Sequence, residues 1–247
     1  MKKNTMMRVA SVLLIAVLLS TCAISGTFAK YVTQYSATAS ARVAKFGVVI
    51  SGSGNLFSAA YIHAPSAADD SSTVLAYNST DTLVAPGTKN TDGLVISLTG
   101  TPEVDVNVSI DVNDSTLKDV YLAAGTYTDM TNKEETFTLA NDYYPVVYTL
   151  TQTKDGGAPT VLASGKMSQI VTALEGLTTD YTANTNLAEE IGDLKITWEW
   201  NFTKNAGIEL DDQADTYLGD LAAGMSLSGV YNLTAAIDIT VTVTQID

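Results

Sequence analysis

Cysteine and histidine are almost absent from this sequence of 247 residues, which contains one of each, Cys22 and His63. A single cysteine cannot form an intramolecular disulfide, and a lone histidine is a poor basis for a zinc site, so we interpret His63 as a surface residue. The cysteine and histidine residues that nucleophilic catalytic triads use are therefore almost absent. No HExxH, Walker or GxSxG motif occurs either. We predict no catalytic residues, no metal and no cofactor, which disfavours an enzyme.

Long hydrophobic runs are also scarce, and the one near the N-terminus is short. Residues 9–19 read VASVLLIAVLL and follow the basic residues Lys2, Lys3 and Arg8. This pattern is typical of a secretory signal rather than of a transmembrane helix. A lipoprotein signal ending at Cys22 is the alternative, although Thr21 is bulky for the residue that precedes a lipidated cysteine.

Small residues mark the expected cleavage site. Thr27 and Ala29 occupy the third and the first position before a cut that leaves Lys30 as the mature N-terminus. We therefore predict that residues 1–29 form a signal peptide, cleaved between Ala29 and Lys30. No second long apolar run follows, and the final residues TVTVTQID carry no sorting signal, so we expect export without a membrane anchor.

Basic residues are few, with 13 against 27 acidic residues and a formal charge of −14. Cleavage after Ala29 removes three of the 13, which leaves ten and moves the formal charge to −17. Such a surface repels nucleic acid and anionic lipid. We therefore expect no nucleic-acid partner and no membrane contact after cleavage, and instead cations or further copies of the chain as partners.

Strand-like alternation dominates the chain after the cleavage site. Apolar residues occupy every second position in residues 44–50, 104–112, 194–202 and 235–243. Each run predicts a strand with one buried face, which would include Phe46 and Ile50 in the first run. Trp198 and Trp200 lie on one face of the third run, and we interpret them as core anchors.

Helical patterns are short by comparison. Residues 168–177 have the best helical spacing, and residues 117–124 suggest a helical turn. Asp155-Gly156-Gly157 predicts a hairpin turn. Together these patterns predict an all-β fold, a jelly-roll-like antiparallel β-sandwich with short helical inserts, in one domain over residues 42–247.

Five carboxylates gather in residues 209–220, which we expect to be a loop. Asp211, Asp212, Asp215 and Asp220 could hold Ca²⁺, because oxygen-rich loops bind this ion, but the spacing does not match an EF-hand. The alternative is a solvated turn in which Asp215 caps a short helix.

Several short motifs, taken in order, carry a resemblance to a known family. Residues 26–32 (GTFAKYV) and 41–48 (ARVAKFGV) resemble the TasA/camelysin (CalY) family of secreted Gram-positive proteins. Further along, the chain is similar to clostridial relatives at residues 83–88 (LVAPGT), 143–146 (YYPV), 198–200 (WEW) and 215–220 (DTYLGD).

The resemblance implies a jelly-roll subunit, released by a dedicated signal peptidase, that builds biofilm-matrix fibres outside a Gram-positive cell. In such fibres the mature N-terminal segment pairs into the sheet of the next subunit, which is donor-strand complementation. On this chain the donor strand would be residues 30–41, held by Tyr31, Val32 and Tyr35 and by backbone hydrogen bonds, while residues 42–50 stay in the home domain. An accessory anchoring or capping protein is a further possible partner.

Two other functions remain open on the sequence. One is a monomeric cell-surface adhesin or carbohydrate-binding sandwich that uses exposed tyrosines or the acidic residues. The other is the metalloprotease activity with which camelysin has been associated, although the sequence offers no recognisable zinc ligands for it.

Overall fold

The computed structural model describes Leu14 and residues 43–63, 72–78, 80–128, 136–201, 209–225 and 229–246, without the side chains of residues 62, 63, 72, 73 and 209–211. The chain divides into two compact units, Met1–Lys45 and Phe46–Asp247. The predicted cleavage site, the predicted donor strand and the side chain of His63 lie outside the described part. The second unit contains all the strands and helices given below.

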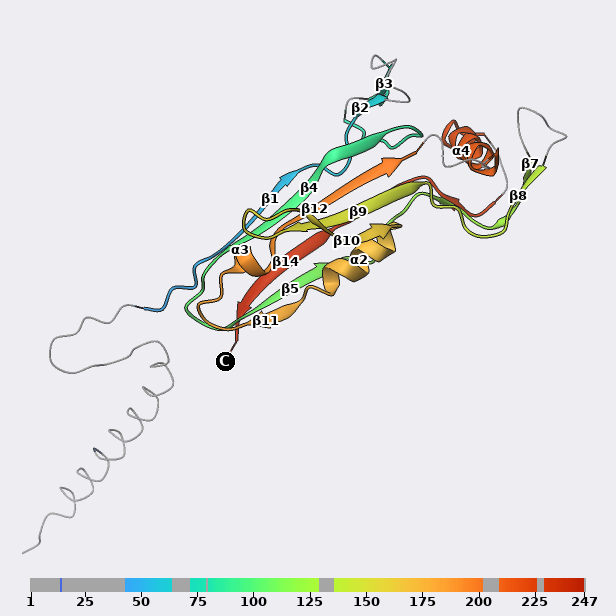
Figure 1. The fold of residues 1–247 in the computed structure, drawn as a ribbon. Coiled ribbons are helices and arrows are strands. Elements are labelled where there is room, and N and C mark those ends of the chain that lie inside the picture. Colours follow the sequence, from blue (N-terminus) through green and yellow to red (C-terminus); the bar gives the residue numbers. More distant parts are fainter. Residues whose placement is uncertain are drawn as a thin grey trace, which may run out of the picture. The chain divides into compact units, whose positions relative to one another are not determined.

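The larger of its two main sheets has five strands in the order β1-β4-β12-β9-β10 (Figure 1). The smaller sheet has three strands in the order β11-β5-β14, and all neighbours in both sheets are antiparallel. The strands are β1 (Val48–Gly54), β4 (Lys89–Gly100), β12 (Gly192–Trp200), β9 (Val146–Thr153), β10 (Thr160–Gly165), β11 (Thr179–Tyr181), β5 (Val106–Val112) and β14 (Ile239–Gln245).

Three short strand pairs and three helices complete the described secondary structure. The pairs are β2 (Ala60–His63) with β3 (Ser72–Leu75), β6 (Tyr121–Leu122) with β13 (Tyr231–Asn232), and β7 (Gly125–Thr128) with β8 (Thr136–Leu139). The helices are α2 (Met167–Glu175), α3 (Leu187–Glu190) and α4 (Glu209–Ala222). None of the described helices is long and apolar enough to cross a membrane.

The inward faces of both main sheets meet in one hydrophobic core. Leu98 of β4, Leu150 of β9 and Val108 of β5 have no exposed surface and belong to the same cluster. Trp198 and Trp200 are 2% and 5% exposed, which confirms their interpretation as core anchors. The alternation of apolar and polar residues thus places one face of each strand in the core, and the predicted all-β antiparallel sandwich is confirmed.

Helix α2 closes the flank of the sandwich between β10 and β5. Its residues Ile170 and Leu174 are buried, and the helix contacts β10, β9 and β5. Directly after it, the Thr178 hydroxyl accepts a hydrogen bond from the Ile110 amide, and β11 pairs with the first half of β5. The edge of β5 that faces away from β14 is therefore covered by α2 and β11 (Figure 1).

Two local predictions are wrong. Residues 117–124 form no helical turn, because Lys118 pairs with Ala236 and residues 121–122 form β6 against β13. The first strand does not bury a continuous face either, since Phe46 and Ile50 are 42% and 41% exposed. In both places the local sequence pattern is present, but the neighbouring strands determine the secondary structure and the burial of the side chains.

Leu98 and Ile50 lie directly opposite each other in the β1–β4 ladder, so they form a matched pair for measuring core burial. We expect Leu98→Ala to lower the free energy of unfolding by about 3 kcal/mol, because it leaves a cavity in the core. Ile50→Ala should lower it by about 1 kcal/mol or less, because water already covers much of that side chain. Urea denaturation of both variants measures the difference, and equal losses would contradict the exposed position of Ile50.

Candidate functional site

The flank of the sandwich opposite α2 lies between β1 and β14, and we call it the open flank. Strand β1 pairs only with β4 among the described strands, and β14 pairs only with β5. Because α2 and β11 lie on the other side of β5, the free edge of β14 is on the side of β1. The open flank is therefore bounded by two sheet edges, one from each main sheet.

Strand β1 presents a poorly covered inner face to this flank. Val48, Ile50 and Gly52 lie opposite Gly100, Leu98 and Ile96, so they share the inner face of β4. Ile96 and Leu98 are buried, whereas Val48 is only partly buried and Ile50 is 41% exposed. The inside of β4 is thus covered more fully than that of β1.

Strand β14 shows the same loss of cover from the other sheet. Its inward residues Ile239, Val241 and Val243 are partly buried, while their partners on β5, which are Val112, Ile110 and Val108, are buried. The alternate residues Thr240, Thr242 and Thr244 are exposed on the outer face. An apolar stripe therefore runs along β14 beside its free edge.

The backbone hydrogen bonds show which residues of β14 face β5 and which face the open flank. The Asn113 amide donates to the Asp238 carbonyl, and the Ile246 amide donates to the Asp105 carbonyl. Hydrogen-bonded pairs alternate in an antiparallel ladder, so the even-numbered residues of β14 bond to β5. Ile239, Val241 and Val243 consequently direct their N–H and C=O groups away from β5, which is the arrangement that another strand can pair with.

The open flank has two distinguishable ends. Val48 begins β1 opposite Gly100, and Gln245 ends β14 opposite Val106. Only residues 101–105 join Gly100 to Val106, so the start of β1 and the end of β14 lie at the same end of the sandwich. We call this the near end and the opposite one, at Gly54 and Ile239, the far end.

The structure places the predicted site residues in two different settings. Ala29, Lys30, Tyr31, Val32 and Tyr35 lie outside the described residues. The acidic residues lie in α4 and not in a loop, which corrects the prediction for residues 209–220. Along this helix Asp212 is exposed, Asp215 is buried and Asp220 is half-buried, while the side chain of Asp211 is not described.

Asp215 lies within α4 and does not cap it. Its Oδ1 accepts hydrogen bonds from the Tyr143 hydroxyl at 2.8 Å and from Trp200 Nε1 at 3.1 Å. The Trp200 backbone in turn pairs with Gly87 and Thr88. The motifs at residues 83–88, 143–146, 198–200 and 215–220, which carry the family resemblance, thus meet at one place that we call the Asp215 junction.

The Asp215 junction anchors α4 to the sandwich. A buried carboxylate that accepts two side-chain hydrogen bonds satisfies both donors and replaces the water it has lost. Among the described side chains, no group of three or more His, Cys, Asp or Glu residues is placed to hold a metal ion. Asp215 itself therefore performs a packing role through its contacts with Tyr143 and Trp200.

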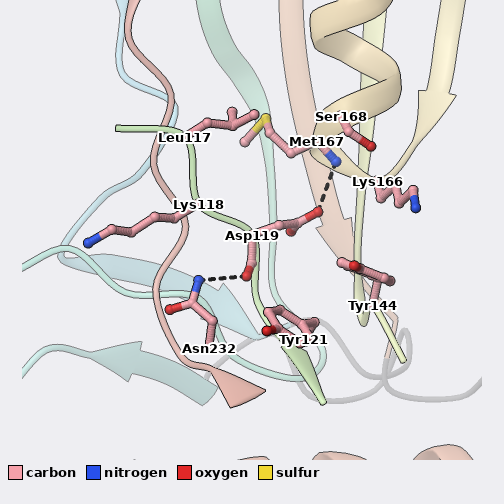
Figure 2. Close-up of a pocket in the computed structure, with 9 residues that line it drawn as sticks. All are labelled: Leu117, Lys118, Asp119, Tyr121, Tyr144, Lys166, Met167, Ser168 and Asn232. Carbon is pink, nitrogen blue, oxygen red and sulfur yellow. Dashed lines mark hydrogen bonds between the residues drawn. The ribbon is translucent and has the colours of Figure 1, made fainter. Parts of the chain in front are cut away.

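A second carboxylate, that of the partly buried Asp119, borders a cavity of about 250 Å³ at the start of α2 (Figure 2). Its Oδ2 accepts a hydrogen bond from the Met167 amide at 2.9 Å, and its backbone carbonyl accepts one from Asn232 Nδ2 at 2.8 Å. Lys166, the residue before the helix, has no side-chain acceptor to cap it. Asp119 supplies the acceptor from a distant part of the chain. It thereby holds α2 over the flank between β10 and β5, which we call the closed flank.

Burial raises the pKa of Asp119 to about 6, against the opposing effect of the Met167 amide. Burial also raises the pKa of Tyr148, which lies near Asp119. Neither Oδ1 of Asp119 nor the Tyr148 hydroxyl has a partner with hydrogen-bond geometry in the described part of the chain. Nothing in the sequence marked Asp119, because its helix lies 48 residues further on.

The cavity beside Asp119 is lined by groups that already contact one another. The rings of Tyr121 and Tyr144 are stacked with centroids 5.6 Å apart, and Lys166 Nζ lies 4.9 Å from the Tyr144 ring centroid. Lys118 and Lys166 extend away from the carboxylate in Figure 2. This arrangement is that of a packed joint between α2 and the strands around β6.

No family model, curated protein or solved structure matches the chain.

The Asp119 joint makes stability depend on pH. A carboxyl group whose pKa rises from 3.8 in the unfolded chain to about 6 in the fold binds its proton more tightly when folded, so the fold loses stability as the pH increases from about 4 to about 6. Asp119→Asn keeps an acceptor for Met167 but carries no charge. We expect this variant to be more stable at pH 7 by about 2 kcal/mol, with a smaller gain at pH 4.

Denaturation curves at several pH values measure this effect. Glu175→Gln, on the exposed end of α2, is the control and should retain the pH dependence of the unmodified protein. An Asp119→Asn protein with unchanged pH dependence would show that another group causes it.

The Asp215 junction predicts a large difference between two aspartates of one helix. Asp215→Ala leaves the Trp200 and Tyr143 donors buried without this acceptor, and we expect a loss of about 3 kcal/mol in the free energy of unfolding. Asp212→Ala, at an exposed position, should change it by no more than about 0.5 kcal/mol. Thermal or urea unfolding compares them, and similar losses would remove the anchoring role of Asp215.

Proposed function

We propose that this protein is an extracellular structural subunit that self-assembles into fibres, in which the mature N-terminal segment of one copy adds as a strand to the next. The observation that carries the proposal is the open flank. It joins the backbone groups of Ile239, Val241 and Val243, which pair with no other described strand, to an apolar stripe on each side, formed by Val241 and Val243 from one sheet and Ile50 from the other.

A strand placed in the open flank would complete the sandwich where α2 does not. Each half-buried Val or Ile that becomes fully covered contributes about 1 kcal/mol, and backbone hydrogen bonds along β14 add to this. The stripe is short, so no single large side chain dominates the contact. The proposed assembly therefore depends on a continuous strand with a regular backbone ladder.

The proposed donor has the opposite charge to the body that would receive it. The donor, residues 30–41, contains Lys30 and no acidic residue, whereas residues 42–247 contain nine basic and 27 acidic residues. Attraction between the segment and the body steers their encounter, although it is weakened by salt. Two bodies of equal charge would repel each other without such a segment between them.

The resemblance to the TasA/camelysin family points to the same role, and with it to secretion from a Gram-positive cell and to a biofilm matrix. An anchoring or capping protein would then start or end each fibre. The alternative function, a monomeric adhesin or carbohydrate-binding sandwich, requires no strand exchange between copies. The proposed function and this alternative are separated by whether the mature chain assembles.

Removal of the donor segment tests the proposal directly. We expect the chain that begins at Lys30 to form filaments visible by electron microscopy, and the chain that begins at Arg42 to remain monomeric in analytical ultracentrifugation. Both retain the whole Phe46–Asp247 unit, so their unfolding midpoints serve as the control for folding. Equal polymerisation by the two proteins, or none by either, would reject donation of residues 30–41.

A further inference from the structure

We propose that the donor strand of a second copy pairs with the free edge of β14, runs antiparallel to it, and enters from the far end of the open flank. This inference rests on the proposed function and adds the acceptor strand and the direction. Direction matters because it decides whether the assembly stays open or closes.

The direction follows from where the chain leaves its own sandwich. Residues 30–42 precede β1, and β1 starts at the near end, opposite Gly100. A copy docked at the far end of its neighbour therefore inserts its donor with Lys30 deepest and Arg42 at the far end. This donor runs from the near end to the far end of the neighbour, while β14 runs from Ile239 at the far end to Gln245 at the near end.

The same reasoning gives the opposite direction for the two competing arrangements. A donor that entered at the near end, or the chain's own segment folded back on the flank, would run parallel to β14. Two copies that meet near end to near end can each donate to the other, which closes the pair by twofold symmetry. Entry from the far end leaves each copy with one free donor and one free acceptor, so assembly continues.

Strand energetics favour the antiparallel arrangement on β14. Antiparallel ladders are somewhat more stable per residue than parallel ones, and every described pair in this sheet is already antiparallel. The free edge of β1 gives the reverse result, since a donor antiparallel to β1 would enter from the near end. Pairing with β14 is thus the choice that combines the better ladder with an open fibre.

The donor sequence suits a strand with one covered face. In residues 31–41 the odd positions read Tyr, Thr, Tyr, Ala, Ala, Ala, and the even positions read Val, Gln, Ser, Thr, Ser. Facing the odd positions inward places Tyr31 and Tyr35 over the apolar stripe and leaves mostly polar side chains outside, as in β14. The twelve residues of the donor span about 40 Å when extended, against about 23 Å for the seven residues of β14, which leaves chain to bridge the two bodies.

Pairs of introduced cysteines test the direction, because the chain from Lys30 to Asp247 has no cysteine of its own. One cysteine replaces Thr240 or Thr244, which are exposed on β14. Their backbone groups bond to β5, so they would form non-hydrogen-bonded pairs with the donor, in which side chains lie closest. The other replaces, one at a time, Gln34, Ser36, Thr38 or Ser40 in the same chain. Mild oxidation followed by non-reducing electrophoresis then reports which pairs form disulfides.

We expect ladders of covalent oligomers. The donor position that crosslinks best to Thr240→Cys should lie four residues after the one that crosslinks best to Thr244→Cys, because antiparallel partners count in opposite directions. Val161→Cys, exposed on the β10 edge, is the matched control acceptor and should give at least tenfold less crosslinked product.

Each other outcome overturns the inference in a recognisable way. The reverse order of donor positions, covalent dimers without a ladder, or a disulfide within one chain would show parallel entry while strand addition itself stands. Filaments that form no disulfide with either β14 position would place the donor on another edge. If neither filaments nor disulfides form, the proposed function fails together with the inference.

Discussion

Among the described residues, the backbone ladder of the smaller sheet stops at β14, and the proposed function depends on that edge. Val108 and Ile110 of β5 are buried because they have β14 on one side and β11 or α2 on the other, whereas Val241 and Val243 of β14 have a described strand beside them on one side only. A sheet edge with unpaired backbone groups and apolar side chains is a hazard when exposed, because any extended chain can pair with it. In the proposed function, the donor strand of another subunit pairs with this edge and covers it.

The closed flank shows how the same problem is solved within one chain. Helix α2 covers the gap between β10 and β5, and Asp119 fastens its first turn by accepting the Met167 amide. At the end of the sandwich, Asp215 holds α4 against Trp200 and Tyr143. Both carboxylates lie in polar contacts that fix a helix, so their burial is explained by architecture. The open flank differs because no described helix or strand lies over it.

Much of the fold could be predicted from local patterns. The predicted runs 104–112, 194–202 and 235–243 alternate with a period of two, and the strands β5, β12 and β14 lie within or overlap them. The helix at Met167–Glu175 and the turn at Asp155–Gly157 were equally clear. The open flank could not be predicted in this way, since Ile50 and Leu98 both lie in strand-forming runs but differ greatly in exposure. Asp215 was expected to cap a helix, and only its contacts revealed a buried acceptor inside one.

The sequence by itself determined that the chain forms amphipathic strands, that it carries an excess of acidic residues, and that cysteine and histidine chemistry is nearly excluded. These properties are local or compositional, so no neighbour is needed to define them. Only the tertiary structure decided which strands are central and which are edges, and therefore that β1 and β14 border one flank. The physical reason is that the burial of a strand depends on what lies beside it. Strand order brings residues as far apart in sequence as Val48 and Gln245 to the same flank, and no local periodicity relates them.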